Sequence, residues 1–218
     1  MGRSKGGGKS GKAPAAVSAS SDNGRGVIAP PAVVGSLLGD AFRPSRKRGI
    51  EVESVGPEAW VARGVLTPGE CDAIRAAADA RGYSHATSRG ARYGEADRDH
   101  GRASYDDAAL ADAIWERTGL GEALVPILGP LGDSSPAGLN PALRVYRYAV
   151  GEVFGAHYDE STRVAGGGNT EFTFLLYLTG GVVGGATAFY RDALLAHDDA
   201  KETFRVAPES GKALVFRH

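Results

Sequence analysis

The sequence predicts an α+β fold in which helices come first and a β-sandwich or barrel follows. Two observations lead to this fold class. Apolar residues recur at helical spacing in segments 67–81 and 107–119, whereas beyond residue 141 they alternate with period two in short runs separated by glycine turns. Apolar residues make up 42% of the 218 residues, which is enough for one core and a tail.

Residues 1–50 are predicted to form a disordered basic tail. The first 26 residues are mostly glycine, serine, alanine and lysine, and burial of so few large apolar side chains cannot offset the entropy lost on ordering. A basic, acid-poor tail is either a plain solvated extension or an organelle-targeting peptide. The cluster at 43–48 (RPSRKR) is also typical of nuclear signals.

Residues 51–140 are predicted to form the helical N-terminal part of the folded region. Its first helix has clear boundary signals. Thr67 is a good N-cap, Pro68 suits the first helical position and Glu70 completes a capping box. Gly82 is the expected end of this helix.

A second helix is expected after the stretch 84–104, with Asp106 or Asp107 as its cap and an end near Gly119. The stretch 84–104 is polar and aperiodic, which predicts a long loop that acts as a lid or substrate contact. Three histidines outside the later motifs are expected to be surface residues: His85 and His100 in this loop, and His197 in an acidic stretch.

Residues 141–218 are predicted to form the β-rich core. The expected strands are 143–148, 153–154 with 157–159, 172–178, a short strand within 184–190, 203–206 and 212–216.

Charge and cysteine content limit the classes of function. A formal net charge of −1 gives no reason to expect nucleic acid as a partner. No apolar run reaches the length of a membrane span, so no membrane association is expected. The single cysteine, Cys71, excludes an intramolecular disulfide framework and fits a reducing compartment, which predicts an intracellular and most simply cytoplasmic protein.

The pair His157 and Asp159 is the main chemical signal in the sequence. Side chains two residues apart on an extended strand point the same way, so both can bind one metal ion. They supply two members of the facial triad of two histidines and one carboxylate, which leaves coordination positions open on Fe(II).

Further motifs surround this pair in a fixed order. They are residues 144–148 (RVYRY), 151–154 (GEVF), 157–160 (HYDE), 174–179 (FLLYLT), 184–189 (GGATAF) and 206–216 (VAPESGKALVF). Over about residues 60–218 this order resembles the Fe(II)- and 2-oxoglutarate-dependent dioxygenases of the prolyl 4-hydroxylase-like branch.

The resemblance implies a double-stranded β-helix (jelly-roll) core and a set of site residues. His157 and Asp159 match the first two iron ligands, Tyr148 matches a tyrosine that contacts 2-oxoglutarate, and Tyr177 matches a second contact to it. The implied reaction uses O₂ to oxidise a substrate C–H bond while 2-oxoglutarate becomes succinate and CO₂. Ascorbate is a further cofactor that the resemblance suggests.

One departure from the family pattern is expected to matter. The third iron ligand and the basic residue that binds the far carboxylate of 2-oxoglutarate come later in the family than residue 218. His218 matches the histidine before that ligand, and is kept as the weaker candidate for the third one. The last core strands are therefore expected to be missing, and the 218-residue chain to be poorly soluble and weak or inactive as an enzyme.

Three functions remain open. The first is a hydroxylase of a peptidyl (prolyl) or small-molecule substrate, and the second is an inactive oxygenase-like binding module. The third is a cupin-like metal hydrolase or isomerase, against which the position of Tyr148 and the lack of a cupin-type histidine cluster argue. The substrate and the oligomeric state are not predicted, because one fold hosts many reactions.

Overall fold

A computed structural model describes residues 35–87, 96–129, 135–164, 167–191 and 202–218. The described strands form three antiparallel sheets, which is compatible with the predicted β-sandwich. The first sheet has the order β1 (Glu51–Gly56), β2 (Ala59–Arg63), β10 (Ala213–Arg217) and β7 (Phe172–Leu176). The second contains β3 (Ser84–Thr87), β4 (Arg98–Asp106) and β5 (Ala142–Arg147), and β6 (Val153–Phe154) also pairs with β4. The third is the pair β8 (Thr187–Tyr190) and β9 (Glu202–Val206).

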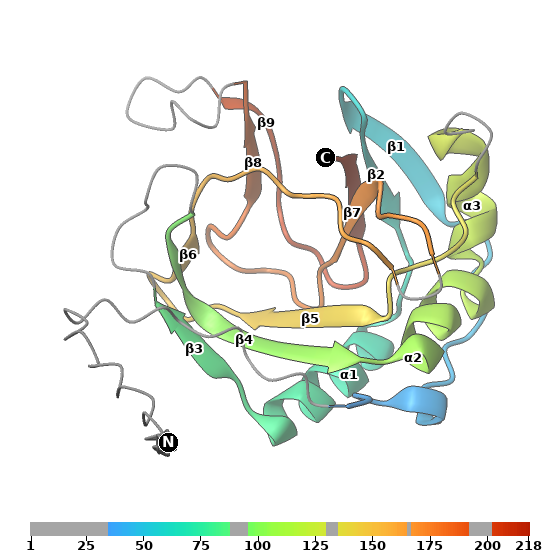
Figure 1. Cartoon of the computed structure of the whole chain (residues 1–218), viewed down its shortest axis with the longest axis horizontal. Helices are drawn as coiled ribbons and strands as arrows, with labels where there is room; N and C mark the ends of the chain where they lie inside the picture. Colours follow the sequence, from blue (N-terminus) through green and yellow to red (C-terminus); the bar gives the residue numbers. More distant parts are fainter. Residues whose placement is uncertain (1–34, 88–95, 130–134, 165–166, 192–201) are drawn as a thin grey trace, which may run out of the picture.

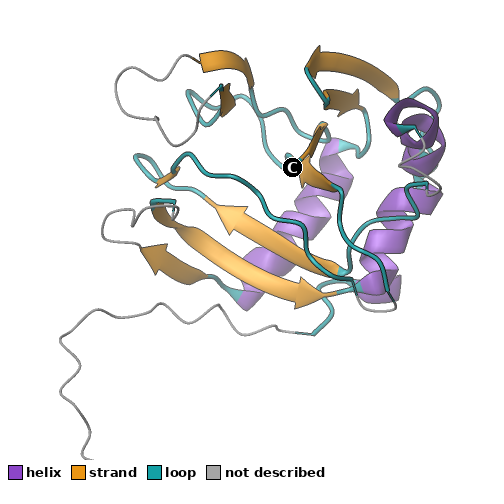
Figure 2. Cartoon of the chain, turned by 45° about the horizontal axis from the view of Figure 1, so that its top comes forward, coloured by secondary structure: helices purple, strands orange, loops and turns teal. Residues whose placement is uncertain are grey.

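Three α-helices lie within the described ranges, together with two further helical turns. They are η1 (Gly39–Ala41), α1 (Pro68–Arg81), α2 (Ala108–Asp112), the π-helical turn η2 (Ala113–Arg117) and α3 (Leu120–Leu128). Figure 1 shows β4 and β5 side by side below the β8–β9 pair, with α2 and α3 at one side. Figure 2 shows the same grouping of helices beside and behind the strands. No helix in the described ranges combines the length and hydropathy needed to cross a bilayer.

The β7–β10 pair separates two apolar clusters and thereby positions the candidate site. Phe174 of β7 and Val215 of β10 belong to the large cluster that includes the helices. Leu175 and Leu214, one residue away on each strand, belong to a second cluster. Because side chains alternate along a strand, Thr173 shares the face of Leu175. His218 follows the last residue of β10, four residues beyond Leu214, and lies beside Thr173.

The N-terminus of α1 confirms the predicted capping box. The Thr67 hydroxyl accepts the backbone N–H of Glu70, and a Glu70 carboxylate oxygen accepts the backbone N–H of Thr67 at 2.7 Å. Pro68 is the first helical residue and Gly82 is the C-cap, as predicted. The other Glu70 oxygen accepts the Ser45 N–H at 2.8 Å, and Lys47 Nζ lies 2.6 Å from the carboxylate. The cap therefore also fastens the segment before β1.

Glu70→Gln is expected to lower the free energy of unfolding by about 2–3 kcal/mol at neutral pH. Burial acts to raise the pKa of Glu70, but hydrogen bonds from the Lys47 ammonium and from two backbone N–H groups outweigh it and lower the pKa to about 2. A lowered folded-state pKa means that this stabilisation is present above the unfolded-state pKa of about 4.5 and is lost as the pH falls toward about 2. Urea unfolding of both proteins between pH 7 and pH 3 measures the difference. Asp72→Asn, on the same helix in an exposed ion pair, should change stability by less than about 1 kcal/mol and is the control.

The described part of the predicted tail differs from the expectation of disorder. In segment 35–50, Leu37 and Phe42 are 2% and 6% exposed and belong to the main core. The backbone N–H groups of residues 37–39 bind the carboxylate of Asp107. The prediction of disorder was based on the composition of the first 26 residues. It does not hold for segment 35–50, because the few apolar side chains of this segment pack into the core. Residues 1–34 lie outside the described ranges.

The predicted long loop at 84–104 is wrong for the residues described. Ser84–Thr87 and Arg98–Asp106 are strands β3 and β4, and β4 pairs with three other strands. The lid interpretation fails for these residues, because removing β4 would remove the centre of a sheet. Residues 88–95 lie outside the described ranges. The small residues Gly101 and Ala103 hide the alternation that would have indicated a strand.

The N-terminal part is not only helical. It contributes strands β1 to β4, and two of them pair with C-terminal strands: β2 with β10 and β4 with β5. Helix α3 was also not predicted. The second predicted helix begins with Asp107 as its cap, as one of the two expected candidates, and its last turn η2 ends at Arg117 with Thr118 as the C-cap, near the expected end at Gly119.

Candidate metal centre

His157 and Asp159 lie in the chain after β6 and point toward each other. The Nε2 atom of His157 is 3.1 Å from Oδ1 of Asp159. The structure assigns no strand to residues 157–159, so the predicted strand there is wrong. The two side chains nevertheless converge, since His157 Nε2 and Asp159 Oδ1 are 3.1 Å apart.

The geometry of this pair suits two ligands of one metal ion. Two ligand atoms that each lie about 2.1 Å from a metal at a right angle are about 3 Å apart. His157 Nδ1 is 2.8 Å from the carbonyl oxygen of Gly155, to which its N–H donates. This bond fixes the ring and directs Nε2 toward Asp159, in the way that an outer hydrogen bond orients a ligating histidine.

Thr173 on β7 holds the Asp159 carboxylate from the opposite side. Its hydroxyl donates to Asp159 Oδ2 at 2.7 Å, which leaves Oδ1 facing His157. The same hydroxyl is 3.5 Å from Nδ1 of His218, and His218 Nε2 is 3.0 Å from the carbonyl oxygen of Thr170. His218 thus lies next to the His157–Asp159 pair, and the Thr173 hydroxyl contacts both Asp159 and His218.

His218 does not complete a compact ligand set. Within the described ranges, one group of three side chains has ligand atoms that all lie within 4.8 Å of one another, and it consists of His85, Asp99 and Glu152. His157, Asp159 and His218 are not such a group. The role of His218 as third ligand stays a prediction.

Electrostatics favour a charged His157–Asp159 pair when no metal is bound. The hydrogen bond to Asp159 is the largest cause that raises the pKa of His157, against the opposing effect of burial. The same bond lowers the pKa of Asp159, helped by Thr173. Both side chains are about a quarter exposed, so ions from solvent can reach them. A metal bound to Nε2 would displace the proton that the pair now shares.

An aromatic cluster connects His157 to Tyr148. The Phe154 ring stacks on His157 with a centroid distance of 4.0 Å and an angle of 11°. The His100 ring lies 5.2 Å from Phe154, 5.0 Å from Tyr148 and 4.8 Å from Tyr146. Tyr148 is half-exposed, and partial burial together with the neighbouring Tyr146 and Glu152 raises its pKa to about 12. That hydroxyl is therefore a hydrogen-bond donor at neutral pH.

His100 was predicted to be a surface residue, and that prediction is wrong. It is 0% exposed, and neither ring nitrogen makes a hydrogen bond within the described residues. Burial lowers its pKa, with the Val153 backbone acting in the opposite direction, so the ring is neutral. His85 is exposed, as predicted, and His197 lies outside the described ranges. The position of His100 could not be read from sequence, because its strand was not recognised.

Tyr177 directly follows the last residue of β7 and lies four residues beyond Thr173. Four residues of extended chain span about 13 Å. The Tyr177 hydroxyl bonds to Thr187 Oγ1 at 2.7 Å, and Nζ of the buried Lys212 is 5.8 Å from the ring centroid. Burial raises the pKa of Tyr177. A contact between Tyr177 and 2-oxoglutarate stays a prediction.

Two curated plant proteins are similar to this chain. The protein named Prolyl 4-hydroxylase 2 of Arabidopsis thaliana is 29% identical over 180 residues, which cover 73% of this chain and 56% of the relative. The protein named Probable prolyl 4-hydroxylase 4 of the same plant is 28% identical over the same shares. The chain thus spans about half the length of the curated relatives it matches. No protein-family model and no solved structure matches it.

Proposed function

We propose that this chain carries the site of an Fe(II)- and 2-oxoglutarate-dependent dioxygenase that hydroxylates prolyl residues in a peptidyl substrate. The observation that carries the proposal is the pair His157 and Asp159, with ligand atoms 3.1 Å apart and both side chains held by outer hydrogen bonds. The similarity to two proteins named prolyl 4-hydroxylases supports the reaction class and the prolyl substrate.

In this proposal His157 Nε2 and Asp159 Oδ1 hold the Fe(II) ion, and His218 is the candidate third ligand. When bound, Fe(II) and 2-oxoglutarate supply the oxidation of a C–H bond by O₂, with one oxygen atom entering the product and the other entering succinate as CO₂ is released. The other residues of the site orient the metal ligands and do not act as acids or bases. Gly155 orients the imidazole, and Thr173 fixes which carboxylate oxygen faces the metal.

The aromatic cluster has two roles in the proposal. Phe154 packs flat on the His157 ring and limits its rotation. Tyr148 is half-exposed and carries a protonated hydroxyl, which can donate a hydrogen bond to a carboxylate of 2-oxoglutarate. Buried His100 packs against both Phe154 and Tyr148 and supports them.

The test is 2-oxoglutarate turnover by the purified chain with Fe(II), ascorbate and a proline-containing peptide. We expect succinate formation that depends on Fe(II), and a loss of at least about 100-fold in His157→Ala and in Asp159→Ala. Thr173→Val keeps the side-chain shape but removes the bond to Asp159, and is expected to weaken metal binding about 10- to 100-fold.

Thr203→Val is the matched control for Thr173→Val. Its hydroxyl donates to the Phe189 carbonyl at 2.9 Å, in the β8–β9 pair rather than at Asp159. The control variant should bind metal as the unaltered chain does. Equal metal affinity in the two threonine variants, or turnover that survives in Asp159→Ala, would contradict the proposal.

A further inference from the structure

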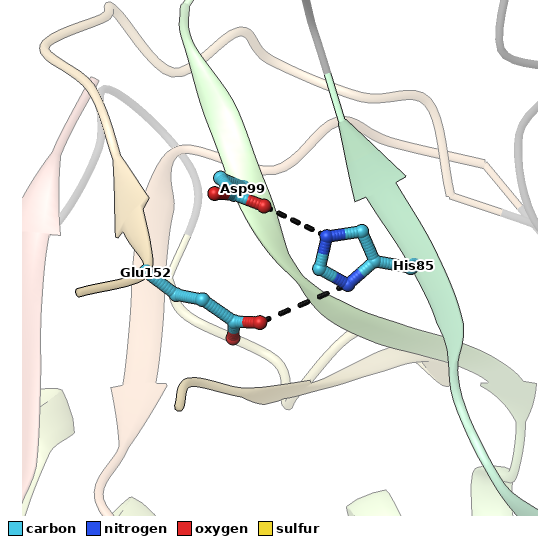
Figure 3. Close-up of side chains that lie close together, drawn as sticks. All are labelled: His85, Asp99 and Glu152. Carbon is cyan, nitrogen blue, oxygen red and sulfur yellow. Dashed lines mark hydrogen bonds and ion pairs between the residues drawn. The ribbon is translucent and has the colours of Figure 1, made fainter. Parts of the chain in front are cut away.

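We infer that His85, Asp99 and Glu152 form a second site, which binds a divalent transition-metal ion and is separate from the His157–Asp159 pair. Figure 3 shows the carboxylates of Asp99 and Glu152 on the same side of the His85 imidazole, one near each ring nitrogen. His85 Nε2 is 2.7 Å from Asp99 Oδ1, and His85 Nδ1 is 3.8 Å from Glu152 Oε1. One ligand atom from each residue lies within 4.8 Å of the other two.

Sheet pairing brings these three residues together. His85 lies on β3 opposite Gly101 of β4, and Asp99 lies two residues before Gly101 on the same strand. The two side chains are therefore diagonal neighbours on one face of the sheet. Asp99 also pairs with Val153 of β6, and Glu152 directly precedes Val153. Three strands thus fix the positions from which the ligands extend.

Local contacts prepare this cluster for a cation. The backbone N–H of Ala149 donates to Glu152 Oε2 at 2.7 Å, which holds the carboxylate and leaves Oε1 facing His85. Arg147, opposite Gly101 on β5, is directed to Asp79 and to the Tyr83 ring.

The donor set points to a first-row transition metal rather than to calcium or magnesium. The imidazole nitrogen suits Zn²⁺ and other first-row transition metals, whereas calcium and magnesium take oxygen ligands. Three protein ligands would leave one position of a tetrahedral zinc ion for water. The His85 and Asp99 side chains are 52% and 51% exposed and Glu152 is 20% exposed, so an ion can enter from solvent. The contact of 2.7 Å between His85 and Asp99 must widen by about 0.7 Å, because two zinc ligands at about 2.1 Å in a tetrahedron lie about 3.4 Å apart.

The cluster is linked to the first site through β6. Glu152 lies two residues before Phe154, whose ring stacks on His157. Metal binding at the cluster would tie β3, β4 and the start of β6 together, and so would brace the strand that carries Phe154. The inference does not depend on the proposed oxygenase activity, because none of its three ligands belongs to the His157–Asp159 pair.

The experiment is a Zn²⁺ titration of the full chain in a His157→Ala/Asp159→Ala background, measured by isothermal calorimetry. In this background the first site is absent, so we expect one Zn²⁺ per chain. Adding Asp99→Asn or Glu152→Gln should weaken that binding at least about 30-fold, with circular dichroism confirming that each variant is folded. Glu122→Gln, an exposed acid on α3 that pairs with Arg46, is the matched control and should leave Zn²⁺ binding unchanged.

Two outcomes would overturn the inference. One is the absence of Zn²⁺ binding in the His157→Ala/Asp159→Ala background. The other is binding that Asp99→Asn and Glu152→Gln leave as strong as in Glu122→Gln. A failure of the oxygenase proposal is seen separately, because it is measured as 2-oxoglutarate turnover in chains that keep Asp99 and Glu152.

Discussion

Gly211→Ala is expected to lower the free energy of unfolding by about 2–5 kcal/mol. Gly211 has φ +79°, where an ordinary L residue costs roughly 1–2 kcal/mol. A Cβ atom there would also lie 1.9 Å from the carbonyl oxygen of Leu66, so the backbone must move, and such overpacking costs about 1–3 kcal/mol. Urea unfolding at neutral pH measures the sum.

The backbone of Gly211 explains why this change reaches the candidate site. Its carbonyl accepts the N–H groups of Val65 and Leu66, and its N–H donates to the Tyr177 carbonyl, each within 3.3 Å. Tyr177 continues the chain of β7, which carries Thr173. The substitution is therefore expected to disturb the β7–β10 register that places Thr173 beside Asp159.

Gly49→Ala separates the two causes of the Gly211 effect. Gly49 has φ +80°, but no atom lies within 4 Å of the position that a Cβ atom would occupy, so its substitution carries the conformational cost alone, about 1–2 kcal/mol. An equal loss of stability in the two variants would contradict this account, because it would mean that the close contact between a Cβ atom at residue 211 and the Leu66 carbonyl oxygen contributes nothing to the loss.

Asp107→Ala is expected to lower the free energy of unfolding by about 3–5 kcal/mol. Asp107 is 2% exposed, and its Oδ2 accepts the N–H groups of residues 37–39 at 2.8–2.9 Å together with the Ser36 hydroxyl. Its Oδ1 accepts the Leu110 N–H at 3.0 Å and so caps α2. Removing the carboxylate leaves several buried donors without an acceptor, each at a cost of about 1–3 kcal/mol, which relaxation partly offsets. Thermal and urea unfolding measure the loss.

Thr67→Ala provides the comparison for Asp107→Ala. Thr67 caps α1 by the same type of bond but lies at the surface, so its removal should cost only about 1 kcal/mol. Burial acts to raise the pKa of Asp107, but the N–H groups of Gly39, Leu110 and Leu38 outweigh it and hold the pKa below its usual value. The stabilisation is therefore present at neutral pH and is lost as the pH falls through the lowered pKa. Similar losses in Asp107→Ala and Thr67→Ala would contradict the bridging role.

Sequence patterns predicted elements where local chemistry determines structure. The Thr67–Glu70 capping box and the period-two strands after residue 141 depend on neighbours a few residues away. The capping box is observed, and so are these strands except at 157–159. β4 escaped prediction because its glycine and alanine positions weaken the alternation, and its partner β5 lies about 40 residues later. Leu37 and Phe42 were placed in a disordered tail because their partners, including Asp107, are distant in sequence.

The candidate site was likewise predicted in part, where the prediction depends on residues close together in the sequence. The spacing of His157 and Asp159 predicted two side chains that converge, since alternation is a local property. Thr173, Phe154 and His100 were not predicted, because their contacts come from the placement of β7, β6 and β4 around the pair. The cluster of His85, Asp99 and Glu152 was not predicted either, because it depends on the pairing of β3 with β4.

Equilibrium binding of 2-oxoglutarate to the chain, with and without Fe(II) under anaerobic conditions, tests the central claim most directly. The His157–Asp159 site predicts that 2-oxoglutarate binds only when Fe(II) is present, and that Asp159→Ala abolishes this metal-dependent binding. Binding of 2-oxoglutarate that is equally strong without metal, or that is unchanged in Asp159→Ala, would contradict it.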